Sequence, residues 1–555
     1  MVRATFSGFN TALSALQANQ KRLDITGQNL SNMNTAGYTR QQLEASSLNY
    51  TNPVSHYSNG NETAVGFGVS MDRVSQIRDP YLDIQYRSQS ADCSYTNRLQ
   101  TALNSLSKVL DETTISGIRK AFDDVQSTLT SMQDPAKVSD PIYESELRTK
   151  MQSVCNLFNQ ASRQITQAEQ NEFQRLTGEG SSEQGDVQKI NDILRQIGDL
   201  NVQIKRNQVA GHPSLELQDE RNLLLDELSG YIPIETRYYK DDAHSGNNAY
   251  DYDANGAVIG KKDWPDDLEV SMNYIDAQGK SQKLILVNGS DLGADGLTKN
   301  YGQLSVLNRD HQPAASVSDP ANISIKFEKA PSYQGNGQAA TDVYAELKGI
   351  HFEGGSLQAS LDMLQKKGTG NVINGSVDDV RGYQYYSEKL DQLADTFAKS
   401  MNASNNGNNH KDQNLLSNST DDSTNGITAG NIGISKGWTS GTIHISTDGT
   451  NRTDTILDMI AAMKDTKKLN GKTFADYMNN LSTQLASDSS SNQTALKTGT
   501  TVLNSILDSR DSLSGVSLDE EATNMMAYVS AYNAASRLMT ALDEVLNTLI
   551  SNTGA

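Results

Sequence analysis

Cysteine, proline and aromatic side chains are scarce in this chain. Only 2 of the 555 residues are cysteines and 10 are prolines, and aromatic residues make up 6% of the chain. Neither Cys93 nor Cys155 stands in a CxxC motif or in a spacing typical of metal ligands. Both fall in helical patterns, so we expect two buried thiols, and nothing in the sequence supports a disulfide between them.

Signals for a membrane or nucleic-acid partner are also missing. No apolar run approaches the 18 or so residues of a membrane-spanning helix, so none is predicted. The first residues, MVRATFSGFNTALSAL, have no apolar core, so we expect no cleaved secretory signal peptide. A formal net charge of −20 opposes binding to nucleic acid and to acidic membranes, because both need clustered lysine and arginine.

Signatures of catalysis are absent from the sequence as well. The 7 histidines are scattered and form neither HxxxH nor HExxH, and no P-loop or strand-linked GxGxxG is present. The stretch DYDANGAVIGKKD, residues 251–263, begins like a calcium loop. Lys262, however, stands where such a loop needs a bidentate glutamate, so we expect a hairpin turn. The sequence therefore predicts no enzyme, no cofactor and no metal site.

Two heptad patterns are present, one near each end of the chain. Apolar residues recur in steps of four and three over about 22 residues near the N-terminus, and the C-terminal stretch repeats this spacing. Residues 1–50 carry 4 cations against 2 acids (+2), and residues 501–555 carry 2 cations against 7 acids (−5). Matched spacing and opposite charge predict that the two terminal helices pair. The predicted interface positions are Phe9, Leu13, Leu16, Leu23 and Leu30 in the first helix and Tyr528, Tyr532, Met539, Leu542, Leu546 and Leu549 in the second.

The stretch NLSNMNTAGYTRQ, residues 29–41, directly follows the first heptad pattern. Asparagine and glycine tolerate left-handed backbone and form side-chain turns. The helix is therefore predicted to end here and to continue as an extended segment through Tyr50. Asn32, Asn34, Gly37 and Tyr38 complete the predicted assembly interface.

Helical and β patterns alternate along the rest of the chain. Helices are predicted within 80–131, 142–176, from 187 onward, 356–366, 376–403 and over most of 453–508. The apolar face predicted for the helix that begins at 187 consists of Ile190, Ile193, Leu194, Ile197, Leu200 and Ile204. Short alternating runs between Gly, Asn and Asp turns predict β structure over 235–355. A Gly/Asn/Ser-rich stretch, 404–450, contains the strand-like GTIHIST. Ser517 and Glu520 form a capping box that starts the C-terminal helix.

These patterns predict a multidomain α+β protein. An elongated, coiled-coil-like helical region is built from both termini, with mainly β domains inserted in the middle. The predicted units are a terminal assembly domain (1–50 and 510–555), a helical rod-like domain (51–235, 356–403 and 453–509), a β-rich insert (236–355) and a variable insert (404–452).

Four stretches resemble a known family. FNTALSALQANQKRLDITGQNLSNMNTAGYTRQ resembles the N-terminal signature of the bacterial flagellar axial proteins, which include rod, hook and hook-associated proteins. MQDPAKVSDPIYESELRTKMQSVCNLFN, LELQDERNLLLDELSGYI and GVSLDEEATNMMAYVSAYNAASRLMTALDEVLNTLI are similar to the hook-associated branch that forms the first hook–filament junction. The inserts at 236–350 and 404–500 show no resemblance that we can name, and they lie where this family varies most.

The resemblance implies a structural role outside the cell. A ring of subunits would join the hook to the filament, with the hook protein and the second hook–filament junction protein as neighbours. Export would use the flagellar type III apparatus and a dedicated chaperone that holds the C-terminal helix. Two alternatives remain open: another axial protein, such as the hook protein or the second junction protein, or an adhesin-like or enzymatic insert, able to bind glycan or calcium, on a flagellar scaffold.

Overall fold

The structure is a computed structural model of the chain. It describes residues 6–48, 68–110, 117–138, 140–178, 182–240, 250–252, 258–261, 266–275, 280–289, 299–307, 324–328, 344–347, 351–373, 376–407, 411–446 and 453–553. Helices dominate and the sheets are small, so the fold class is α+β, as the sequence predicts.

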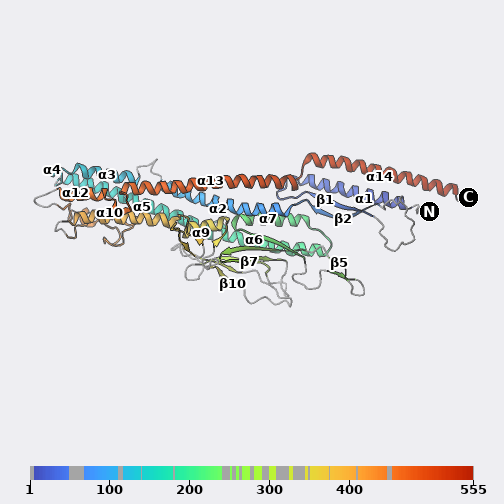
Figure 1. Ribbon diagram of the computed structural model, residues 1–555, viewed down its shortest axis with the longest axis horizontal. Coiled ribbons are helices and arrows are strands. Elements are labelled where there is room, and N and C mark those ends of the chain that lie inside the picture. The colour runs from blue at the N-terminus through green and yellow to red at the C-terminus, as the bar shows by residue number, and fades with distance from the viewer. Residues whose placement is uncertain are drawn as a thin grey trace.

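The molecule is elongated, and both chain termini lie at one end of it (Figure 1). Helices α1 (Phe6–Ser31) and α14 (Leu518–Thr553) occupy this end. Helices α2 (Pro80–Leu110) and α13 (Phe474–Ser514) pack along each other and lead toward the opposite end. No helix of the described part is long and apolar enough to cross a membrane.

The terminal end is a helix pair with a β-ribbon. Strands β1 (Gln41–Ser47) and β2 (Val69–Gln76) pair antiparallel and pack against α1. Helix α14 runs antiparallel to α1: a Cβ at Gly8 would lie 3.3 Å from the Leu542 side chain, and Arg22 lies over the Tyr528 ring at 5.6 Å. The predicted contact between the two terminal helices is therefore present.

The opposite end is a helical body. It comprises α3 (Ile118–Ser131), α4 (Pro135–Val138), α5 (Pro141–Thr177), α10 (Tyr383–Asn405), α11 (Lys436–Ser440), α12 (Asp454–Lys464), the 3-10 turn η2 (Lys467–Leu469) and the first half of α13. Phe122 is the centre of its aromatic core, since its ring lies 5.9 Å from Phe158, 5.1 Å from Phe397 and 5.5 Å from Phe474. Helices α6 (Asp186–Val209), α7 (Leu215–Tyr231) and α9 (Gly355–Gln365) occupy the middle of the molecule. The predicted apolar face of α6 is confirmed, because Ile190, Ile193, Leu194, Ile197, Leu200 and Ile204 are all buried.

Strands fill the middle of the sequence and lie along one side of the molecule (Figure 1). In one sheet, β6 (Asp266–Ile275) pairs antiparallel with β3 (Glu235–Lys240), β7 (Ser281–Asn288) and β11 (His351–Phe352). In a second, β9 (Ser324–Glu328) lies between β8 (Gln303–Leu307) and β10 (Tyr344–Leu347). Smaller pairs are β4 (Tyr250–Tyr252) with β5 (Val258–Lys261), β12 (Val372–Ile373) with β13 (Ser376–Val377), and β14 (Leu416–Asn418) with β15 (Ile432–Ile434).

The calcium-like stretch and the cysteines are placed as follows. Asp251 lies in β4, which pairs with β5 as a hairpin requires, while residues 253–257 and 262–263 are outside the described part. Cys93 and Cys155 are both buried and are not joined to each other, as expected. Burial raises the pKa of the Cys155 thiol to about 12.

Two predicted elements are wrong. Helix α10 begins at Tyr383 and not at 376, because Ser376 and Val377 pair with β12 and Asp378 binds the backbone of the preceding loop. GTIHIST forms no strand over its described residues, 441–446. Ser446 there bonds instead to Asn405 at the end of α10, and the strands of this segment are β14 and β15. In GTIHIST local β-propensity was overridden by the contact with distant Asn405, whereas at 376–377 a short local strand pair takes the place of the predicted first helical turn.

Candidate functional site

In the NLSNMNTAGYTRQ stretch, the Asn29 side chain makes the hydrogen bonds that fix the turn after α1. The Asn29 side chain, 1% exposed, donates from Nδ2 to the Gln41 carbonyl (2.9 Å) and accepts the Gln41 backbone N–H at Oδ1 (3.0 Å). The Tyr38 hydroxyl donates to the same Oδ1 over 2.8 Å. Between these residues Gly37 takes φ +79°, the left-handed region that the sequence predicts for this turn. Asn29 therefore fixes the direction in which β1 leaves the end of α1.

The α1 face that meets α14 is displaced by one residue from the predicted seam. Gly8 and Arg22 contact α14, and the buried positions Ala12, Asn19 and Thr26 share their face at heptad spacing. Leu13, by contrast, is 46% exposed. These contacts with α14 fall on positions adjacent to the predicted seam, whose other leucines, Leu16, Leu23 and Leu30, are half-buried.

The remaining predicted interface residues take several environments. Phe9, Leu16, Leu23, Leu30, Asn32, Gly37, Tyr38, Tyr528, Met539, Leu542 and Leu546 are half-buried, Asn34 and Tyr532 are exposed, and the side chain of Leu549 is outside the described part. On α14, four residues of the predicted seam are half-buried, and buried Ala535 lies on the same face. The role of these residues in contacts between subunits stays a prediction.

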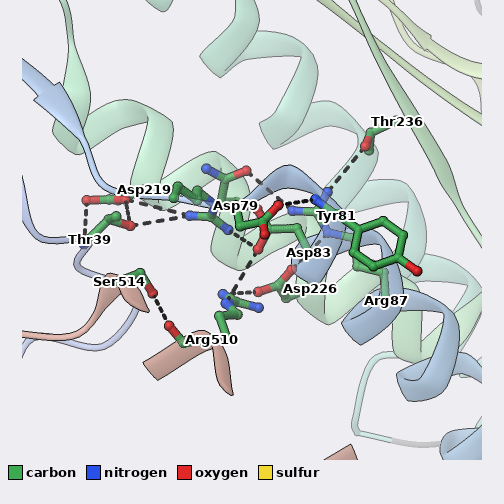
Figure 2. A network of polar contacts seen from close by, with 12 residues as sticks. Thr39, Asp79, Tyr81, Asp83, Arg87, Asp219, Asp226, Thr236, Arg510 and Ser514 are labelled. Atoms are coloured by element: carbon green, nitrogen blue, oxygen red, sulfur yellow. Dashed lines mark hydrogen bonds and ion pairs between the residues drawn. The ribbon is translucent and has the colours of Figure 1, made fainter. Parts of the chain in front are cut away.

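A network of buried charges connects the turn after α1 with α2, α7 and the last turns of α13 (Figure 2). Asp219, in the first turns of α7, accepts the Thr39 backbone N–H (3.1 Å) and the Thr39 hydroxyl (2.6 Å). Arg78 donates to Asp83 over 2.5 and 3.1 Å and to the Thr39 hydroxyl over 3.3 Å. These contacts join the turn after α1, the segment before α2 and the start of α7.

Arg510 continues the network from α13. Its guanidinium lies 2.6 Å from Asp226 and 3.5 Å from Asp83, and it stacks over the Tyr86 ring at 4.9 Å. Asp226 also accepts a hydrogen bond from Arg87 over 2.9 Å, and Figure 2 shows Arg87 and Arg510 approaching it from different helices. The side chains of Asp83, Arg87 and Asp226 are at most 9% exposed, so each charge depends on its partners.

Arg40 binds both the end of α13 and the start of α14. Its backbone N–H donates to the Ser514 carbonyl over 2.9 Å at the end of α13. Its side chain donates to Glu520 over 2.7 Å and to Glu521 over 2.8 Å, in the first turn of α14. The sequence predicts a capping role for these acids, and the Glu520 N–H does lie 3.5 Å from the Ser517 hydroxyl. Their pairing with Arg40 was not foreseen.

Burial and pairing shift the ionisation of two groups in this network. Burial raises the pKa of Asp219, although the hydrogen bonds from Thr39 oppose the shift. For Arg78, burial acts to lower the pKa, but the hydrogen bond and charge of Asp83 outweigh it and the pKa is raised. Among the residues that the structure describes, no three His, Cys, Asp or Glu side chains are grouped to hold a metal ion. The network thus serves to connect segments of the fold.

Sequence reasoning missed this network, although one signal was present. Asp219, Asn222 and Asp226 belong to the stretch LELQDERNLLLDELSGYI, where apolar residues alternate with acids and amides too closely for a solvated helix face. Asn222 accepts from Arg87 over 3.3 Å, so all three side chains take part. Their partners lie more than 130 residues away in the chain, which no local pattern can show.

Comparisons with known proteins agree on one family. The family model described as "Flagellar hook-associated protein FlgK helical domain" matches residues 103–416, more than half of the chain. "Flagella basal body rod protein" matches residues 9–39, and "Flagellar basal body rod FlgEFG protein C-terminal" matches residues 510–552. The terminal matches cover α1 with its turn and nearly all of α14.

Individual relatives carry the same name. Flagellar hook-associated protein 1 of Bacillus subtilis is 29% identical over 568 aligned residues, covering 99% of each chain. The protein of that name from Escherichia coli is 27% identical over 231 residues, 41% of this chain and 39% of its own. A solved structure, the flagellar hook junction protein FlgK from Burkholderia pseudomallei, aligns at 17% identity over 61% of this chain and 45% of its own, with a TM-score of 0.35. The helical-domain match over residues 103–416 shows that this chain belongs to the flagellar hook-associated FlgK family, whose members are structural components of the bacterial flagellum.

Proposed function

We propose that this chain forms the ring of subunits that joins the flagellar hook to the filament. The observation that carries the proposal is the similarity to a hook-associated protein 1 along 99% of both chains. A match confined to the terminal helices would suit any axial protein, whereas the match to the helical domain favours the hook-associated branch.

The distribution of exposed apolar residues supports self-assembly through the terminal helices. On its exposed surface, a helix of an isolated globular protein would carry mainly polar side chains. Helix α14 instead exposes large apolar side chains at Leu518, Met526, Val529, Leu538, Val545 and Ile550. Such surfaces in a chain destined for an assembly mark contacts between subunits. We therefore assign the predicted interface residues of α1 and α14 to a coiled-coil-like layer that neighbouring subunits complete.

Specific neighbours follow from this role. The hook protein would contact one side of the ring and the second hook–filament junction protein the other. Before assembly, the exposed apolar face of α14 needs cover, which suits an export chaperone that holds this helix. Export through the flagellar apparatus requires no cleaved signal peptide. The β-rich segment 236–355 and the segment 404–452 would be the inserts of this protein, the second one lying on the helical body through the contacts of Trp438 with Glu144 and Arg148 of α5.

A deletion strain tests the proposal. Cells lacking this chain are expected to build hooks but no filaments and to release unpolymerised flagellin into the medium. Expression of the full chain should restore filaments. Filaments that persist without the chain, or the loss of hooks together with filaments, would contradict the junction role and favour a different axial position.

A further inference from the structure

Asparagine is abundant in this chain, and in several places a glycine follows it directly. An asparagine side chain next to a glycine is open to attack by the glycine backbone nitrogen, because no Cβ shields that nitrogen. The attack closes a five-membered succinimide ring, and it requires that both the side-chain amide and the N–H are free to move toward each other. The structure describes four such pairs: Asn288 with Gly289, Asn406 with Gly407, Asn425 with Gly426, and Asn470 with Gly471.

In two of these pairs a hydrogen bond holds the attacking nitrogen. The Gly289 N–H donates to the Leu268 carbonyl over 3.1 Å, and Asn288 itself is only 5% exposed. The Gly471 N–H donates to the Thr466 carbonyl over 2.8 Å. Each bond must break before the glycine nitrogen can reach the asparagine side chain.

The other two pairs differ in their side chains. The Asn406 amide is engaged, since its Nδ2 donates to Asn414 Oδ1 over 2.7 Å and its Oδ1 accepts the Gln413 N–H over 2.7 Å. Asn425 and Gly426 lie in the segment between β14 and β15, and both are exposed. Within the described part of the chain, no hydrogen bond holds the Asn425 side-chain amide or the Gly426 N–H. Of the four described pairs, this one alone meets both requirements of the reaction.

We propose that Asn425 is a site of spontaneous covalent modification, at which the chain converts slowly into aspartate and isoaspartate forms. The Gly426 nitrogen gives its proton to solvent base and attacks Asn425 Cγ, and the side-chain nitrogen leaves as ammonia. Water then opens the succinimide at either carbonyl. The net reaction consumes the amide and one water and yields a carboxylate and ammonium, so it needs no oxidant and no enzyme.

Both products alter the surface of this segment. Each adds a negative charge three positions after Asp422. In the isoaspartate form the backbone also runs through Cβ, so one extra carbon enters the chain directly before Gly426, whose carbonyl accepts Asn431 Nδ2 over 3.0 Å. The exposed surface between β14 and β15 therefore changes with the age of the molecule. This inference goes beyond the junction role and does not depend on it.

Ageing of the purified full chain tests the assignment. The folded chain is incubated at mildly alkaline pH, and samples taken over time are digested with trypsin. Tryptic peptides 412–436 and 469–472 carry Asn425 and Asn470 respectively. Mass spectrometry with fragmentation then locates the modified residue and separates aspartate from isoaspartate. We expect both products at Asn425, and a rate at Asn470 that is lower by about fivefold or more, because the Gly471 N–H must first leave its hydrogen bond.

Matched controls separate the fold from the local sequence. Unfolding in guanidinium chloride removes the hydrogen bonds, so the two sites should then react at similar rates. Asn425→Gln should abolish the modified forms of peptide 412–436 and leaves the backbone at Gly426 unchanged. An intact Asn425 in the aged folded chain, or equal rates at Asn425 and Asn470 before unfolding, would overturn the inference. Aspartate without isoaspartate would also overturn it, because it would indicate direct hydrolysis without the ring. None of these outcomes bears on the junction role, which the deletion strain tests.

Discussion

The Arg510 guanidinium nitrogen Nη2 lies 2.6 Å from Asp226 Oδ2, although the two residues are 284 positions apart in the chain. The pair joins the last turns of α13 to α7 (Figure 2).

Removing Arg510 is expected to destabilise the fold strongly. Arg510→Ala leaves Asp83 and Asp226 buried without one of their cations, and breaking such a pair costs about 3 kcal/mol. Denaturant unfolding of the full chain measures the loss. Lys399→Ala removes an exposed ion pair with Asp395 and should cost below about 0.5 kcal/mol. Equal losses for the two variants would show that the Arg510 pairs contribute no more than a surface pair.

Removing the Asn29 side chain should destabilise the turn between α1 and β1. Asn29→Ala deprives the Gln41 N–H and carbonyl of their partners, and unsatisfied buried groups cost about 1–3 kcal/mol each. Hydrogen exchange should therefore accelerate at the Gln41 amide as the free energy of unfolding falls. Exposed Asn34→Ala is the matched control and should change stability by less than about 0.5 kcal/mol. Unchanged exchange at Gln41 would mean that Asn29 does not hold this turn.

The turn also depends on the backbone of Gly37. Its φ of +79° strains any residue with a Cβ, so Gly37→Ala is expected to cost about 1–2 kcal/mol in unfolding free energy. A Cβ there would meet the Leu223 Cβ at 3.4 Å, an ordinary contact. Gly211 has φ +92° and nothing within 4 Å of such a Cβ, so Gly211→Ala isolates the backbone cost. Similar losses support backbone strain as the cause, whereas a much larger loss at Gly37 would point to crowding against Leu223.

Asp378 makes stability depend on pH. Its carboxylate accepts the backbone N–H groups of Lys367, Gly368 and Thr369 over 2.9, 3.0 and 3.1 Å. Burial acts to raise the pKa of Asp378, but these bonds and that of the Thr369 hydroxyl outweigh it and the pKa is lowered. The stabilisation is thus complete above the unfolded-state value of about 3.9 and is lost as pH falls through the lower folded-state value.

The variant Asp378→Asn checks this dependence. It should be less stable than the native chain by about 1–3 kcal/mol at pH 7, because one amide oxygen replaces two carboxylate oxygens. The difference should shrink below about pH 4, as the native carboxylate becomes protonated. Exposed Asp379→Asn serves as the control and should show no such trend. A gap between native chain and Asp378→Asn that stays constant down to pH 3 would contradict the lowered pKa.

Much of the fold was accessible from periodicity alone. The apolar spacing of α6 predicted its buried face residue by residue, because a helix that packs on one side must repeat every three or four positions. The turn at Gly37 was equally accessible, since only certain residues tolerate left-handed backbone. The start of α10 was missed for another reason: Ser376 and Val377 pair with the nearby Ile373 and Val372, and a pair of two-residue strands is too short to show an alternating pattern.

The sequence by itself determined where α1 and α14 form and that each needs an apolar partner, because helical periodicity is written in consecutive residues. Only the tertiary structure decided which face of α1 meets α14, which carboxylates surround Arg510, and that Arg40 closes the break before α14. The physical reason is that these contacts join residues hundreds of positions apart. Their geometry depends on how the whole chain packs, and no spacing within a single segment records it.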